Sequence, residues 1–277
     1  MGPGNSAKIE IANVEKTFVS RRGRLEALKG IDFAIGDREF ACLLGPSGCG
    51  KSTLLNMVAG FERPTRGRVR VNGAEVTRPH PSRGVVFQEP ALFPWYTVLQ
   101  NVTFGPKTQR QPGAEYLRRA AQAIELVGLQ GFEHHYPAEL SGGMKQRVGI
   151  ARILVMQPEV LLMDEPFGAL DAQTRWLMQE LLLRLWETQQ QTVLFITHDV
   201  DEAIFLADTV YVMTARPGSI KRRIAVDLPR PRTLEMTTAA RFNEIKLEAL
   251  GLIREESLKA AAALSCDASE AVRIGDG

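Results

Sequence analysis

Cysteine is scarce in this chain. Its 277 residues include three cysteines, Cys42, Cys49 and Cys266, which are widely spaced and form no Cys-x-x-Cys pair. Neither a disulfide framework nor a zinc site is therefore indicated, and a reducing compartment such as the cytosol is the natural environment.

Long apolar runs are also missing. No run approaches the roughly 18 residues of a membrane-spanning helix, and the polar N-terminus lacks the apolar core of a signal peptide. If the protein acts at a membrane, we expect another subunit to anchor it. Residues 1–6 are expected to form a disordered leader.

Net charge is low, because 34 basic and 32 acidic side chains leave a formal charge of +2. This balance disfavours a nucleic-acid-binding protein whose affinity depends on neutralising many phosphates. It permits one local site for an anionic nucleotide. The content of 44% hydrophobic and 24% charged residues is typical of a globular protein, with one large domain or two small ones.

The pattern of apolar residues predicts strands at both ends of the chain and helices between them. Alternation around Ile9–Ile11 and Ile31–Ile35 indicates half-buried antiparallel strands, whereas the continuous runs Phe40–Leu44 and Val85–Phe87 indicate central strands covered on both faces. From about Thr97 to Met156 the spacing becomes helical. Further strands are expected at Val160–Met163, Val193–Ile196, Tyr211–Met213 and Ile224–Val226, with a helix from about Gln173 to Glu187. Crossover helices between strands predict a parallel sheet.

A phosphate-binding loop follows the first continuously apolar strand. The segment Gly45–Ser52 matches G-x-x-x-x-G-K-[ST] and precedes a helix. Its glycines allow backbone amides to surround phosphate oxygens, Lys51 would reach the β and γ phosphates, and Ser52 would ligate Mg²⁺. Cys49 is more simply a small filler than a redox switch. The residues expected to bind ATP here are Gly45, Pro46, Ser47, Gly48, Cys49, Gly50, Lys51, Ser52 and Thr53.

Two carboxylates end a later apolar strand. Asp164 follows Val160–Met163 directly, and Glu165 comes next. Alone, the sequence Asp-Glu-Pro could be a turn, but beside a phosphate loop it is typical of a metal-binding strand end. We expect Asp164 to hold Mg²⁺ through water and Glu165 to act as the general base that polarises the attacking water.

A third motif, Leu140–Arg147, reads Leu-Ser-Gly-Gly-Met-Lys-Gln-Arg and stands just before the Asp164 strand. Together with Gln88, Ala169–Asp171 and Thr197–Asp199, in that order around it, the chain resembles the ATP-binding cassette (ABC) ATPases over about residues 8 to 230. The resemblance implies an α/β fold, with a phosphate-loop NTPase core like that of RecA, a mixed sheet, an antiparallel β subdomain and an inserted helical subdomain.

The resemblance also implies roles for several residues. Ser141 and the amides of Gly142 and Gly143 would contact the γ-phosphate of ATP held by a second copy, in a head-to-tail dimer with two ATP molecules. Asp171 would take part in that interface, His198 would hold the attacking water and Glu165, and Gln88 would touch Mg²⁺ and sense a transmembrane partner. Without the resemblance, Ser-Gly-Gly is a helix cap, Gln88 is a capping amide and His198 is structural.

Two positions depart from the usual family pattern. Met144 replaces the commonest glutamine, so a polar contact with the nucleotide from that side chain is lost. Phe18 replaces the commoner tyrosine that stacks on adenine, which keeps the ring and loses the hydroxyl; core packing is its alternative role.

The segments Gln88–Trp95 and Ala215–Gly218 resemble cassettes of nitrate, sulfonate and taurine importers. This likeness implies an ATPase on the cytoplasmic face of the bacterial inner membrane, a peripheral protein that drives separate permease subunits and, through them, an extracytoplasmic solute-binding protein. Phe93, Pro94 and Trp95 are candidates for the permease contact, or else form the core of the helical subdomain. A regulatory or nucleic-acid-linked ABC ATPase is the alternative function.

The expected domains follow from these motifs. Residues 1–88 and 157–232 would form the nucleotide-binding core, residues 89–156 the helical subdomain and residues 233–277 a C-terminal helical extension. From sequence alone, this extension could pack on a partner cassette or remain solvated.

Overall fold

The computed structural model describes residues 7–21 and 23–274, with side chains to residue 260. The leader expected at residues 1–6 lies outside the described residues. The chain forms two compact units, one of Met1–Thr77 with Ile196–Gly277 and one of Arg78–Phe195. The domain boundaries expected at residues 88/89, 156/157 and 232/233 stay predictions.

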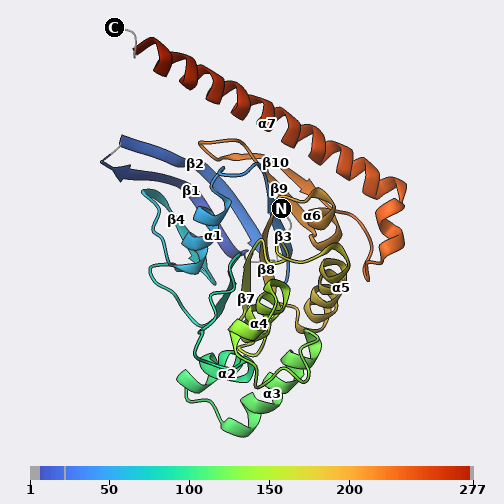
Figure 1. The fold of residues 1–277 in the computed structure, drawn as a ribbon. Helices are drawn as coiled ribbons and strands as arrows, with labels where there is room; N and C mark the ends of the chain where they lie inside the picture. The colour runs from blue at the N-terminus through green and yellow to red at the C-terminus, as the bar shows by residue number, and fades with distance from the viewer. Residues whose placement is uncertain (1–6, 22, 275–277) are drawn as a thin grey trace. The chain divides into compact units, whose positions relative to one another are not determined.

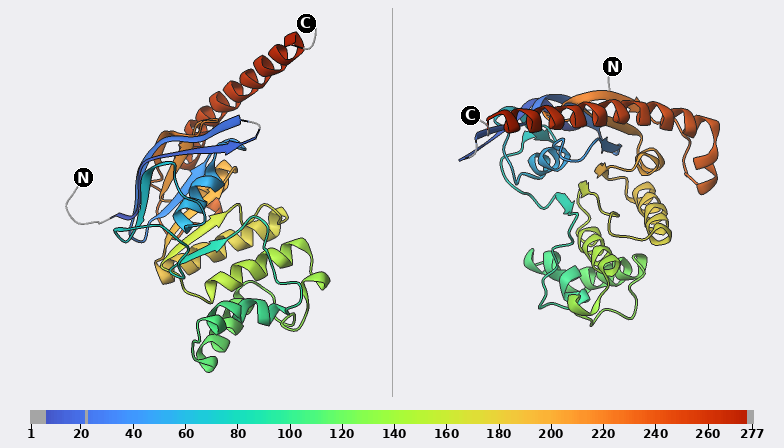
Figure 2. Two further views of the ribbon diagram at one scale, coloured as in Figure 1. Left: turned by 90° about the vertical axis from the view of Figure 1, so that its left-hand side faces the viewer. Right: turned by 45° about the horizontal axis from the view of Figure 1, so that its top comes forward.

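The first unit contains an antiparallel sheet, whose two long strands are seen in Figure 2. Its strand order is β2-β1-β4-β5, and the pairs Ile11↔Phe33 and Val14↔Ile31 set the register of the two long strands. Ile9, Ile11 and Val14 are at most 1% exposed while their neighbours are more open, as the alternating pattern predicts. The strands are β1 (Ala7–Ser20), β2 (Gly23–Gly36), β4 (Arg66–Val71) and β5 (Ala74–Glu75).

Three further strands of this unit flank the Gly45–Gly50 loop and the turn between residues 213 and 220. Strand β3 (Phe40–Leu44) runs parallel to β9 (Thr209–Met213), which pairs antiparallel with β10 (Ile220–Ala225). Every residue of β3 and β9 is buried, which confirms the covered strand expected at Phe40–Leu44. The same expectation for Val85–Phe87 was wrong, because Val85 is only partly buried and Phe87 is 40% exposed. The helices of the unit are α1 (Lys51–Ala59), α6 (Val200–Leu206), the short 3₁₀ segment η2 (Leu234–Thr238) and α7 (Ala240–Ile274).

Helix α7 packs on its own unit, against α6, β9 and β10 (Figure 1). Phe242, Ile245 and Ala249 are buried on its inner face. The first turns of α7 therefore pack on their own unit through one face, and most of their other residues are exposed. Within the described residues, no helix combines the length and the apolar character required to cross a membrane.

Helix α6 is fixed at both ends. At its start, the Asp199 carboxylate accepts hydrogen bonds from the amides of Asp201 and Glu202 at 2.9 and 3.2 Å. At its end, the buried Arg232 guanidinium donates through Nη1 to the carbonyls of Ile204, Phe205 and Ala207 at 2.9, 3.0 and 2.7 Å. Arg232 thus satisfies carbonyls that a helix terminus leaves without intrahelical partners.

The second unit combines a parallel strand pair with most of the helices. Strand β6 (Arg83–Val86) runs parallel to β7 (Val160–Asp164), and β8 (Thr192–Thr197) follows β7 in the strand order and continues into the first unit. Helices α2, α3 and α4 contact one another, which confirms the helical stretch expected from the 97–156 pattern (Figure 2). The helices are α2 (Val98–Thr108), α3 (Gly113–Leu126), the 3₁₀ turn η1 (Pro137–Glu139), α4 (Gly142–Leu154) and α5 (Ala172–Gln189).

One strand prediction was wrong. The run Val85–Phe87 was expected to form a central strand, but β6 stands at the end of its sheet's strand order. Its apolar character reflects cover by a helix, because a Cβ added at Gly84 would lie 2.5 Å from Ile153 Cγ2 and 2.7 Å from Pro158 Cγ. Close packing at the end of α4 therefore covers Gly84, while alternate residues of this edge strand stay partly exposed.

Candidate functional site

The phosphate loop of the first unit joins β3 to α1. Strand β3 ends at Leu44 and α1 begins at Lys51, so Gly45–Gly50 form the connection. The N-cap residue Gly50 has a φ of 102° and no side-chain capping hydrogen bond. No capping side chain therefore accepts a hydrogen bond from the backbone amides of the first turn of α1. A helix N-terminus of this kind can bind phosphate oxygens.

Lys51 lies inside this loop. Its Nζ donates to the carbonyls of Gly45 and Pro46 at 2.8 and 3.0 Å, and the residue is 6% exposed. The ammonium group is thus held within the loop in the position that suits a bound phosphate. Cys49 is 1% exposed, and burial raises the pKa of its thiol, which fits the expected small filler.

His198 shares an edge of the first unit with the phosphate loop. It directly follows Thr197, the last residue of β8, and the backbone of Thr197 hydrogen-bonds the thiol of Cys42 in β3. The last residue of β8 therefore lies beside β3, the strand that leads into the phosphate loop, and His198 follows it directly.

Phe18 lies on β1 in the first unit and is 38% exposed. The Lys16 ammonium stands 4.9 Å from the ring centroid and is itself held by Glu62 at 2.6 Å. The partly exposed ring is compatible with the stacking role and does not belong to the buried core.

In the second unit, the metal and base candidates share one sheet edge. The register pairs Val86 with Met163, so Gln88 and Glu165 each stand two residues beyond that pair, next to Asp164 at the end of β7. Glu165 has a φ of 45°, in the left-handed region that glutamate seldom adopts. Amide and carboxylate oxygens are ligands that suit Mg²⁺.

The signature residues form the open N-terminus of α4. Ser141 is the N-cap, with its Oγ accepting from the Met144 amide at 3.3 Å, and a Cβ added at Gly142 would meet nothing within 4 Å. Ser141 therefore has the helix-cap role expected from the Ser-Gly-Gly sequence alone. The same helix start also presents backbone amide donors. Asp171 similarly caps α5, and the hydrogen bond from the Thr174 amide at 2.9 Å lowers the pKa of its carboxyl.

Three side chains near these motifs were not identified from the sequence. Gln146 Nε2 donates to the Phe87 carbonyl at 3.0 Å, and Arg152 donates to the Ala91 and Pro90 carbonyls at 3.1 and 3.3 Å. Both join α4 to the segment around Gln88. Arg216 donates through Nε and Nη2 to the Gly48 carbonyl at 3.1 and 2.8 Å. Gln146 and Arg216 lie within quoted motifs, but no local signal indicates partners so far away in sequence.

The strand, glycine-rich loop and helix of the first unit, with a lysine enclosed by the loop, define a phosphate-loop nucleotide-binding protein. The family model for ABC transporters matches residues 28–168. The nitrate import ATP-binding protein NrtD of Synechocystis is 50% identical over 240 residues, covering 87% of this chain and 89% of that protein. The taurine import ATP-binding protein TauB of Burkholderia thailandensis is 45% identical over 256 residues, covering 91% of this chain and 98% of that protein.

The solved structures agree with this assignment. The dimeric, post-hydrolysis ATP-binding cassette MJ0796 bound to ADP and Pi superposes with a TM-score of 0.72 at 31% identity, covering 80% of this chain and 100% of that one. The chain belongs to the ABC transporter family. It is an ATP-hydrolysing cassette of that family, as the sequence motifs indicated.

Proposed function

We propose that the chain is the ATPase subunit of a bacterial importer that takes up a small oxyanion, such as a sulfonate, taurine or nitrate, through a separate permease. The observation that carries the proposal is the match over about nine tenths of the chain to relatives named as nitrate and taurine import ATP-binding proteins. The chain would work as a peripheral protein at the cytoplasmic face of the inner membrane.

ATP would be held by the phosphate loop, with Lys51 and the backbone N–H groups of Gly45–Thr53, except that of Pro46, which has none, on its phosphates and Phe18 on its adenine. Ser52, Gln88 and Asp164 would hold Mg²⁺, since hydroxyl, amide and carboxylate oxygens each suit this ion, and bound Mg²⁺ would supply charge neutralisation on the phosphates. Glu165 would accept a proton from the attacking water, and His198 would orient Glu165 and that water.

A second copy of the chain would complete each ATP site. Ser141 and Gly142 are exposed and Gly143 is half-buried at the start of α4, and Asp171 lies exposed at the start of α5. The donors of one copy would contact the γ-phosphate of the ATP that the other copy holds. ATP would therefore favour a head-to-tail dimer. The solved MJ0796 cassette, described as dimeric with ADP and Pi, supports this arrangement.

The permease would dock on an aromatic cluster of the second unit. Phe93 packs on Trp95, Tyr96 and Phe104 with centroid distances of 5.9, 5.5 and 4.5 Å, and Arg152 lies 5.6 Å from the Phe93 ring centroid. Trp95 is 66% exposed and Phe104 is 36% exposed, whereas Phe93 and Tyr96 are half-buried. A large exposed aromatic side chain in such a cluster is suited to a protein contact.

Copurification from detergent-solubilised membranes tests the proposal. A tagged chain should recover a hydrophobic permease, and Trp95→Ala should reduce that recovery severalfold while nucleotide binding stays intact. Leu247→Ala is the matched control, because Leu247 is 71% exposed on α7 and is not part of the aromatic cluster. Turnover stimulated by DNA or RNA, with no permease recovered, would favour the regulatory alternative and overturn the proposal.

The solute class is tested separately on the reconstituted transporter with its binding protein. Nitrate or taurine should stimulate ATP turnover, whereas a neutral sugar should not. Stimulation by the sugar alone would refute the oxyanion assignment and leave the ATPase assignment intact.

A further inference from the structure

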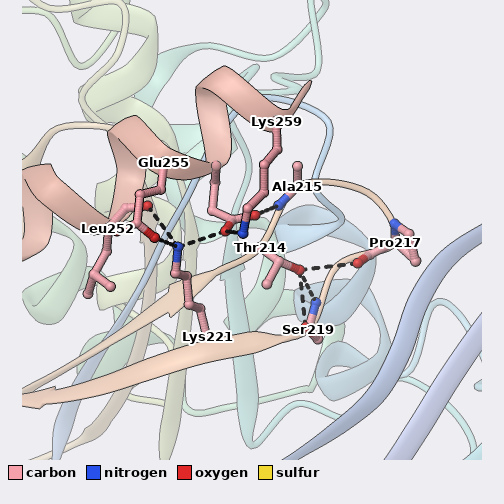
Figure 3. Close-up of polar contacts among 9 residues, drawn as sticks. Thr214, Ala215, Pro217, Ser219, Lys221, Leu252, Glu255 and Lys259 are labelled. Atoms are coloured by element: carbon pink, nitrogen blue, oxygen red, sulfur yellow. Dashed lines mark hydrogen bonds and ion pairs between the residues drawn. The ribbon is translucent and has the colours of Figure 1, made fainter. Parts of the chain in front are cut away.

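Glu256 on α7 is a fully partnered carboxylate buried against the β9–β10 turn. It is 2% exposed, its Oε2 accepts from the Ala215 amide at 3.0 Å, and its Oε1 pairs with Lys221 and Lys259 at 2.7 and 2.8 Å. Figure 3 labels these three partners, Ala215, Lys221 and Lys259. Burial alone would raise the pKa of Glu256, but hydrogen bonds from Lys221, Lys259 and the Ala215 amide lower it to about 2. The carboxylate is therefore an ionised anchor between α7 and the turn.

The turn at Thr214–Ser219 packs directly on the phosphate loop. A Cβ added at Gly218 would lie 2.0 Å from the Cys49 carbonyl oxygen, so only glycine permits this approach. The Gly218 amide donates to Ala27 at 2.9 Å, and its carbonyl accepts from Lys29 at 3.0 Å. The backbone of the turn is thus fixed on one side by β2 and in contact with the loop on the other.

Arg216 extends from this turn to the residue before Cys49. Its Nε and Nη2 both donate to the Gly48 carbonyl, and Gly48 itself has a φ of 75°. The side chain of Arg216 is exposed, so these bonds do not serve to pack the core. They constrain the orientation of a peptide group in the loop that binds phosphate.

These contacts form one continuous path. Glu256 holds the Ala215 amide, Ala215 is bonded to Arg216, and Arg216 holds the Gly48 carbonyl. Beside the anchor that β2 provides at Gly218, Glu256 therefore holds the other side of the turn, from which Arg216 reaches the phosphate loop.

We propose that α7 sets the conformation of the phosphate loop through Glu256 and Arg216, which act as positioning residues for ATP binding. The ligand affected is ATP, so this inference rests on the ATP site given under the proposed function. The C-terminal extension is thereby part of the nucleotide site's machinery, although it does not reach the nucleotide itself.

The test compares Arg216→Ala, Glu256→Gln and the double variant in the full chain. Each single change should weaken ATP binding about tenfold, the effect of one charge-assisted hydrogen bond, with kcat at saturating ATP within about twofold of the parent. The double variant should bind ATP no more weakly than either single variant, because both residues act along one path. Arg216→Lys, which retains one donor, should recover part of the affinity.

Glu248→Gln is the matched control. Glu248 is another α7 carboxylate that pairs with a β10 cation, Arg222, at 3.4 Å, but that pair is exposed and does not contact the turn. The ATP affinity of the Glu248→Gln variant should equal that of the parent. Since Arg216 is exposed, Arg216→Ala should fold even if Glu256→Gln does not. Unchanged ATP affinity in folded Arg216→Ala, or equal losses in Glu248→Gln and Glu256→Gln, would overturn the proposal.

Discussion

The backbone at Glu165 gives the sharpest prediction, because a strained residue stands where the general base is expected. A φ of 45° in a residue other than glycine costs about 1 to 2 kcal/mol, and such outliers persist at functional sites. Replacement by glycine removes that cost but adds about 0.5 to 1 kcal/mol of chain entropy in the unfolded state. Glu165→Gly should therefore raise the free energy of unfolding by up to about 1.5 kcal/mol, whereas Glu165→Gln should leave it nearly unchanged.

Turnover should respond in the opposite way. Both variants lack the carboxylate that accepts the proton, so hydrolysis should fall at least roughly 10²-fold, which is about 2.7 kcal/mol of barrier. ATP binding should survive in both, because the phosphate loop is untouched, and Glu165→Gln should accumulate as an ATP-bound dimer in size-exclusion chromatography.

The assay pairs denaturant unfolding with phosphate release for each variant. Gln190→Gly is the matched control, since Gln190 is exposed at the end of α5 with a φ of 54°. It should gain stability similarly and keep full turnover. Turnover at the parent rate in Glu165→Gln would refute the base assignment, and lower stability in Glu165→Gly than in Glu165→Gln would refute the strain argument.

Two further predictions concern the first unit. Tyr211→Phe should lower the free energy of unfolding by about 1 kcal/mol, because the Tyr211 hydroxyl donates to the Ala34 carbonyl at 2.9 Å; thermal unfolding measures this, and an unchanged midpoint would contradict it. Cys49 should react slowly with iodoacetamide at pH 7.5 and faster as pH rises, because burial raises the pKa of its thiol and keeps the reactive thiolate scarce. Peptide mass spectrometry separates Cys49 from the other cysteines, and reaction at the rate of the guanidinium-unfolded chain would contradict the burial argument.

The sequence was most informative where a function depends on adjacent residues. The Gly45–Ser52 loop, the buried Phe40–Leu44 strand and the capping position of Ser141 all follow from local pattern, and the structure has a loop, a strand and a cap there. The assigned roles in catalysis and metal binding stay predictions.

Features that depend on distant partners could not be predicted. Arg216 and Gly48 are 168 positions apart, and Gln146 and Phe87 are 59 apart, so no local spacing joins them. The edge position of β6 was missed for a related reason, since an apolar run reports burial without identifying the element that covers it. The left-handed backbone at Glu165 also has no signature in its residue type.

The cap that Arg232 places on α6 has a consequence for where the chain can be shortened. The region that the family model matches ends at residue 168. Arg232, whose guanidinium is the donor to three carbonyls at the end of α6, lies 64 residues beyond that limit. A deletion that removes Arg232 would leave those buried carbonyls without their donor and loosen the helix that follows His198. Fragments of this cassette that end before Arg232 should therefore unfold at lower denaturant concentration than the full chain.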